Sequence, residues 1–200
     1  MTLKSLNSSA IVTQITSGTK TSQPPIEAGA LVLSQEVSQR ALEKMLESDE
    51  TPYKRTLTVE DGVNTLVPLQ AKYSKDFEIA GYDIDTTNVS NDNLQAAYRA
   101  VLTSLVPLPV DKIKERLGIM AMIITLPKDF SPKVLAMKTE ILAEKLHEYP
   151  ADILLHTFDY IEKHNRFWPT LAEFHEHCSW QVRPRRLMKE VLHKCIASRT

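Results

Sequence analysis

The sequence predicts a mainly α-helical protein. A C-terminal helical bundle of about five helices should span residues 93–197, preceded by an irregular segment with a weak β signal and a disordered N-terminal tail. Apolar residues recur at steps of three and four from Asn93 onward, and prolines punctuate that repeat. The first 29 residues contain very few large apolar side chains. We therefore divide the chain into residues 1–29, 30–92 and 93–197.

The N-terminal segment has the composition of a flexible tail. Residues 1–29 include ten Ser or Thr. Such a segment buries too little apolar surface to offset the entropy lost on ordering. We expect it to be disordered in isolation, with the capacity to become ordered against a partner.

A first helix is predicted from Ala30 to Leu46, where the apolar residues fall roughly on one side. It should end before Thr51-Pro52, because the residue that precedes a proline avoids the α region.

Residues 52–92 leave two interpretations open. Arg55–Val59 alternates polar and apolar residues, and with Thr65–Leu69 it fits a small hairpin around Asp61-Gly62. Pro68 weakens the second strand, because proline cannot donate to the ladder. We favour the other interpretation, an extended connector laid over a helical body. The polar, turn-rich residues 83–92 then mark a boundary.

The bundle begins after that boundary. Asp92 or Asn93 can cap its first helix. Pro109 suits the first turn of the next helix, and Pro127 ends it. The β-branched residues at 123–125 leave a strand interpretation open for its second half.

The remaining helices carry clear start signals. Ser131-Pro132 combines a cap with a first-turn proline. After the break at Pro150, Asp152 lies in the first turn of another helix, where its charge suits the positive helix end. Thr170 and Glu173 have capping-box spacing. Pro184 predicts the start of a last helix.

Composition predicts a soluble cytoplasmic protein. The formal net charge is −1, so no global basic charge favours nucleic acid. Two cysteines cannot form a disulfide framework and suit a reducing compartment. The N-terminus lacks the apolar run of a signal peptide, and no stretch approaches the ~18 apolar residues of a membrane span.

No recognisable catalytic motif is present. His175 and Cys178 share a helix face, but a zinc site requires four ligands, and neither CxxC nor HExxH occurs. Phosphate-loop and GxSxG signatures are also missing. We therefore expect no enzymatic activity, no metal and no cofactor.

A local basic signal lies near the C-terminus. From Lys163 to Arg199 there are eight Lys or Arg against three Glu, a net charge of +5. Arginines bind phosphates as planar forks. The candidate nucleic-acid-binding residues are Arg183, Arg185, Arg186 and Lys189. Simple solvation of charges near a terminus is the alternative.

Two motifs carry a resemblance. Tyr149-Pro150-Ala151-Asp152, then Phe158, then Phe167-Trp168-Pro169-Thr170-Leu171-Ala172-Glu173, resemble small helical proteins of tailed phages and bacterial prophages. The second half also resembles, more loosely, the N-terminal helical domain of phage helicase loaders and inhibitors. This resemblance covers about residues 95–192. Unlike those loaders, the chain has its disordered candidate segment at the N-terminus.

The resemblance implies a non-enzymatic DNA replication accessory protein that binds a replicative helicase or a related replication factor in a bacterial host cell. The residues expected to bind the partner are His164, Arg166, Trp168 and Glu173. Two other functions stay open. One is a phage-encoded interaction protein with another partner, such as a host-defence complex or a virion component. The other is a DNA-binding module that uses the last helix. No membrane partner is expected.

Overall fold

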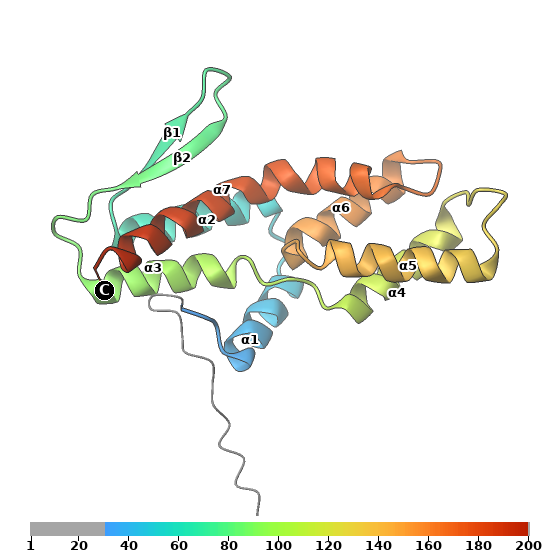
Figure 1. Cartoon of the computed structure of the whole chain (residues 1–200), viewed down its shortest axis with the longest axis horizontal. Coiled ribbons are helices and arrows are strands. Elements are labelled where there is room, and N and C mark those ends of the chain that lie inside the picture. The colour runs from blue at the N-terminus through green and yellow to red at the C-terminus, as the bar shows by residue number, and fades with distance from the viewer. Residues whose placement is uncertain (1–30, 200) are drawn as a thin grey trace, which may run out of the picture.

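The fold is mainly helical, as predicted. A computed structural model describes residues 31–199 (Figure 1), and within them lie seven α-helices and one two-stranded antiparallel sheet. The predicted disorder of residues 1–29 lies outside the described residues. No helix in the described part of the chain is both long and apolar enough to span a membrane.

The N-terminal third contains two helices and a hairpin. Helix α1 spans Gln35–Leu46 and is capped by Ser34, so it starts later than predicted. Helix α2 spans Pro52–Leu66. Strands β1 (Leu69–Tyr73) and β2 (Ile79–Ile84) then pair, with Leu69 opposite Ile84.

The favoured interpretation of residues 52–66 as an extended connector is wrong, and so is a hairpin centred on Asp61-Gly62. Thr51 Oγ1 accepts from the Lys54 amide, and Pro52 occupies the first turn of α2. Thr56 and Val63 are buried along one side of this helix. The hairpin exists, but it lies beyond the helix.

The predicted five-helix bundle is confirmed. Its helices are α3 (Asn91–Thr103), α4 (Val110–Ile123), α5 (Pro132–Leu146), α6 (Ala151–His164) and α7 (Leu171–Ala197). Ser131 caps α5, as predicted. Ser90 caps α3 in place of Asp92 or Asn93. The open strand interpretation at the end of α4 is wrong, because α4 is helical to Ile123.

The two helices predicted from Thr170 and from Pro184 are one helix, because α7 continues through Pro184. A proline inside a helix removes one hydrogen bond and costs about 3 kcal/mol. Buried neighbours on both sides, Val182, Arg185 and Met188, hold the helix in place across this position.

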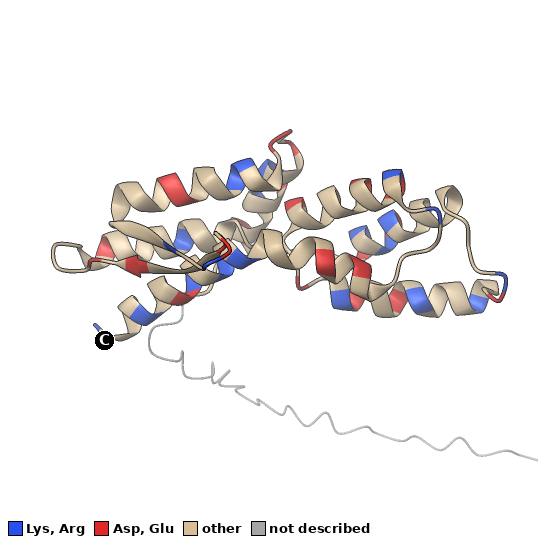
Figure 2. Cartoon of the chain, turned by 90° about the horizontal axis from the view of Figure 1, so that it is seen from above, with Lys and Arg blue, Asp and Glu red and all other residues tan. Residues whose placement is uncertain are grey.

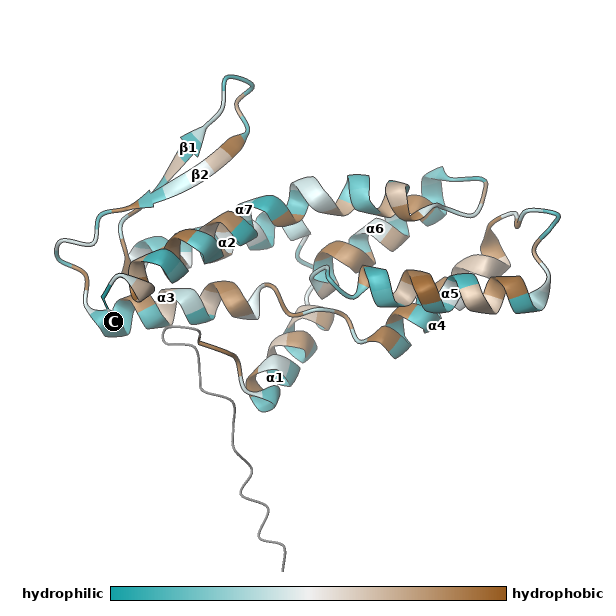
Figure 3. Ribbon diagram, viewed as in Figure 1, coloured by the Kyte–Doolittle hydropathy of each residue, from teal (hydrophilic) through white to brown (hydrophobic). Residues whose placement is uncertain are grey.

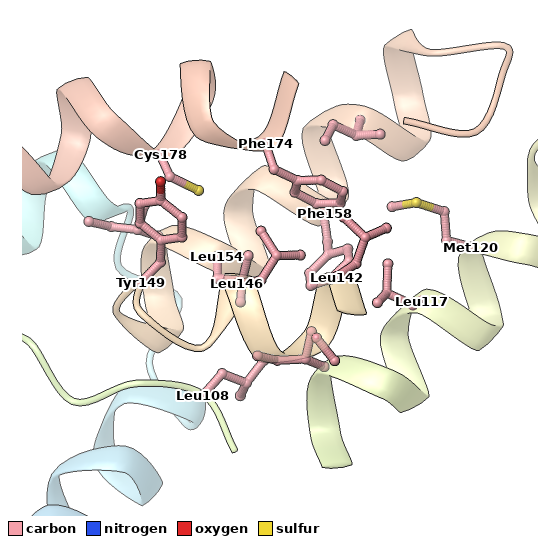
Figure 4. Close-up of a cluster of buried hydrophobic side chains, with 14 of the residues drawn as sticks. Leu108, Leu117, Met120, Leu142, Leu146, Tyr149, Leu154, Phe158, Phe174 and Cys178 are labelled. Carbon is pink, nitrogen blue, oxygen red and sulfur yellow. The ribbon is translucent and has the colours of Figure 1, made fainter. Parts of the chain in front are cut away.

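Two hydrophobic cores meet along α7 (Figure 3). One lies among α1, α4, α5, α6 and the first turns of α7, and the other among α2, the hairpin, α3 and the C-terminal half of α7. Figure 4 shows the first core, where the rings of Phe158 and Phe174 meet edge to face with centroids 5.2 Å apart. At 27 residues, α7 spans about 40 Å and so connects both cores.

Candidate functional site

The corner between α6 and α7 is built by side-chain caps. The Thr170 amide donates to Glu173 Oε2 (2.7 Å), and the Glu173 amide donates to Thr170 Oγ1 (3.4 Å), which confirms the predicted capping box. Asn165 Nδ2, at the end of α6, donates to the other carboxylate oxygen of Glu173 at 2.9 Å. One carboxylate therefore ties the end of α6 to the start of α7.

Backbone hydrogen bonds attach the corner to the end of α4. The Thr125 amide donates to the Arg166 carbonyl (3.0 Å), and the Trp168 amide donates to the Thr125 carbonyl (3.2 Å). These two bonds form an isolated parallel bridge between Thr125 and Phe167. The segment is thus held on both sides, and its side chains project from a fixed backbone.

The structure separates the two aromatic residues of the corner. Trp168 is only 9% exposed, and its ring meets Phe130 edge to face with centroids 6.4 Å apart. The prediction of Trp168 as an exposed partner contact is wrong, because the α4–α5 loop covers most of the ring. Phe167 is 61% exposed, with the Arg166 guanidinium 5.6 Å from its ring centroid.

A shallow groove of about 480 Å³ lies beside this corner. We call it the corner groove, and its principal lining residues are Phe130, Lys138, Ile141, Trp168, Pro169 and Leu171. Ile141 is 58% exposed, one helical turn after the equally exposed Met137. The Lys138 ammonium sits 4.6 Å from the Phe130 ring centroid. The groove therefore combines an apolar surface with one cation, Lys138, and one anion, Asp129.

Of the other predicted partner contacts, Glu173 lies inside the corner, and His164 and Arg166 are exposed beside it. The Glu173 carboxylate accepts the hydrogen bonds of the caps. The hydrogen bond from the Thr170 amide holds the pKa of this carboxyl below its usual range. His164 is exposed, stacks on Tyr160 with ring centroids 4.1 Å apart, and approaches the Tyr160 carbonyl at 2.7 Å. Arg166 is exposed beside Phe167. Arg166 is therefore the predicted partner contact that the structure leaves most available.

The predicted basic set on α7 is partly buried and partly ion-paired. Arg183 is ion-paired with Glu78 of the hairpin at 3.1 Å, and Arg186 with Glu148 at 3.7 Å. Lys189 is exposed. Arg185 is fully buried, so its prediction as a nucleic-acid contact is wrong.

Arg185 forms a buried polar node between the two cores. Its guanidinium makes a bidentate pair with Asp152 of α6 at 2.7 and 3.0 Å, and its Nε donates to Thr56 Oγ1 of α2 at 2.9 Å. Its remaining donors reach the carbonyls of Pro52 and Ser104, each at 2.8 Å. All five N–H directions of the arginine are thereby matched to an acceptor, and four segments of the chain meet at one side chain.

The side chains of His175 and Cys178 do not combine into a reactive pair. His175 is exposed and contacts the Tyr149 hydroxyl through Nδ1. Cys178 is fully buried and lies 3.4 Å from Thr157 Oγ1. Burial raises the pKa of its thiol to about 11, so the thiol is neutral near pH 7 and a poor nucleophile. Within residues 31–199, no three His, Cys, Asp or Glu side chains are grouped to hold a metal ion.

The sequence does not single out Ile141 and Leu171, two exposed residues that line the groove. Periodicity marks apolar helix faces, but it does not tell which member of such a face stays uncovered. Comparison with known protein families, with curated proteins and with solved structures finds no match. The corner and its groove are accordingly interpreted from their own geometry.

Proposed function

We propose that this chain is a non-enzymatic, phage-type DNA replication accessory protein that docks on a replicative helicase or a related replication factor through the corner between α6 and α7. The main observation in support of the proposal is that the Phe167 side chain is exposed on an immobilised backbone. Its ring stands in solvent while the backbone on either side is tied to α4 by hydrogen bonds.

A fixed, exposed aromatic side chain is suited to protein binding. Aromatic residues and arginine are enriched in protein interfaces, and a few such anchors carry most of the binding energy. Because the caps and the Thr125 bridge already immobilise the corner, little conformational entropy would remain to be lost on association. Arg166 beside the ring adds a cation to the same contact.

The earlier partner-binding prediction is revised on this basis. Phe167 and Arg166 are the proposed contacts, Trp168 forms a wall of the corner groove, and Glu173 positions the corner through its caps. The specific class of partner rests on the resemblance of the YPAD and FWPTLAE segments to phage replication proteins, and a cytoplasmic location in a bacterial host belongs to the same proposal.

Co-purification tests this function. The full chain is mixed with a replicative helicase at micromolar concentration, and association is followed by size-exclusion chromatography and by a titration. We expect Phe167→Ala to weaken binding about tenfold or more, because it removes a central aromatic anchor. Tyr53→Ala is the matched control, since Tyr53 on α2 is an aromatic residue of similar exposure, 66% against 61%. No association, or equal losses in the two variants, contradicts the proposal.

The alternative functions make different predictions. A host-defence or virion-assembly partner would appear as a stable complex without helicase when partners are purified from the native host. DNA binding through α7 would depend strongly on salt and weaken when Arg183 and Arg186 become alanine. The geometry favours DNA binding less, because both arginines are ion-paired within the fold.

A further inference from the structure

The corner groove exposes apolar surface that folding does not use. Ile141 on α5 and Leu171 at the start of α7 line the hollow and are 58% and 39% exposed, and Phe130 and Trp168 also line it. An apolar hollow with a few polar groups at its edge is the usual form of a groove that takes apolar side chains from a partner.

The surroundings of the groove are positively charged. Residues 127–140 and 162–173 contain Lys128, Lys133, Lys138, Lys163 and Arg166 against four acidic residues, a net charge of +1. Of the acidic residues, Glu140 and Glu162 are ion-paired with Lys114 and Arg116, and Glu173 is hydrogen-bonded in the caps, which leaves Asp129. Figure 2 shows both basic and acidic positions at the end of the helical body farthest from the C-terminus. Among residues 31–199, none of the five cations belongs to an ion pair, whereas Arg183 and Arg186 on α7 are both paired.

We propose that the corner groove takes an acidic amphipathic segment of a partner protein. Its apolar side chains lie between Ile141 and Leu171, and its carboxylates face Lys128, Lys133 and Lys138. This inference rests on the protein-binding part of the proposed function, not on the identity of the helicase. Charge complementarity selects this occupant, since an acidic flank meets unpaired cations.

Three other possible occupants of the groove fit less well. The chain's own residues 1–30 carry two lysines and one glutamate, so their charge has the same sign as the groove. A second copy docking corner to corner would bring two basic surfaces together, which is repulsive. Nucleic acid matches the charge but supplies no large apolar side chain for Ile141 and Leu171.

A displayed library of random peptides tests the inference on the full chain. Peptides selected on the wild-type protein should be enriched in Asp and Glu next to Leu, Ile or aromatic residues. The triple variant Lys128→Glu, Lys133→Glu, Lys138→Glu should select peptides of opposite charge. All three lysines are exposed, and an unchanged circular dichroism melt would show that this variant folds. Enrichment of basic or neutral peptides on the wild type, or no enrichment, overturns the inference.

A titration of the best selected peptide locates the contact. Ile141→Ala should weaken binding about fivefold or more. Ile123→Ala is the matched control, because Ile123 on α4 has the same side chain and nearly the same exposure, 59%, and lies outside the groove. Binding should also weaken as salt is raised. Equal effects of the two substitutions would place the peptide elsewhere and contradict the proposal.

Two further outcomes distinguish a protein segment from nucleic acid in the groove, and this inference from the helicase proposal. A 20-base-pair DNA duplex is the second probe, and duplex binding that is lost in the charge-reversed variant but unchanged in Ile141→Ala would identify a nucleic-acid surface and overturn the inference. Acidic peptides that bind the groove while the helicase does not associate would leave this inference intact and remove the helicase from the proposed function.

Discussion

Replacing Arg185 by alanine should be among the most damaging single substitutions in the chain. The side chain is fully buried and contributes a bidentate pair with Asp152 and three further hydrogen bonds. Its removal leaves the Asp152 carboxylate inside the protein with only Arg55, at 3.3 Å, and leaves the carbonyls of Pro52 and Ser104 without this donor. Breaking a buried ion pair in this way costs about 3–5 kcal/mol.

Arg183→Ala provides the control, since Arg183 lies two residues earlier on α7 and is also ion-paired, at 3.1 Å, but its side chain is 51% exposed. Exposed pairs contribute about 0–1 kcal/mol. For a chain of this size, 1 kcal/mol shifts the melting temperature by about 2–4 °C. Arg185→Ala should therefore lower it by about 6–20 °C, and Arg183→Ala by no more than about 4 °C.

Thermal and urea unfolding, followed by circular dichroism at 222 nm, measure both variants. The double variant Arg185→Met, Asp152→Leu should be less destabilised than Arg185→Ala, because no uncompensated carboxylate remains in the interior. Similar melting temperatures for Arg185→Ala and Arg183→Ala would refute the reasoning, since they would show that the polar node does not join the two cores.

Two further predictions concern the hairpin and the corner. Phe77 has a φ of 61° and is 89% exposed, so Phe77→Gly should relieve left-handed strain and raise the free energy of unfolding by about 1 kcal/mol; a lower urea midpoint would contradict this. Glu173→Ala should cost about 1 kcal/mol at pH 7. Because folding lowers the pKa of Glu173, its stabilising effect is fully present above the ordinary value of 4.5 and is lost as the pH falls through the lowered folded-state value. The melting temperatures of wild type and Glu173→Ala should therefore converge as the pH falls from 7 through the folded-state pKa, and a difference that stays constant over this titration would argue against the cap.

The Arg185 node also shows that part of the sequence pattern stabilises the fold and is not free to bind a partner. Asp152 belongs to the YPAD segment that carries part of the phage resemblance, yet its carboxylate is committed to the interior. The FWPTLAE segment divides in the same way, with Trp168 and Pro169 buried and Phe167 and Leu171 exposed. In these two segments, the buried side chains therefore stabilise the fold, and only the exposed side chains are available for contact with a partner.

Local sequence patterns predicted part of the helix starts, whereas the caps Ser34, Thr51 and Ser90 were missed. The caps at Ser131 and Thr170, and the break at Pro150, depend on backbone groups within three or four residues, so their side chains alone predict them. Residues 55–59 were assigned wrongly, because so short an alternation of polar and apolar residues fits a period of two and a period of 3.6 equally well. The α2 helix is identified by the burial of Thr56 and Val63 against other parts of the chain.

By itself, the sequence determined a mainly helical chain, most helix starts, and an α6–α7 corner that is stiff because of its own capping box. Only the tertiary structure decided which residues of that corner face solvent and how far α7 extends. Trp168 is covered because Phe130, 38 residues earlier, lies against it, and α7 passes Pro184 because packing from both cores outweighs one lost hydrogen bond. Arg185 looked like a surface cation until Asp152, from another helix, was placed beside it. Contacts between residues that are distant in sequence determine these features, so no local sequence pattern predicts them.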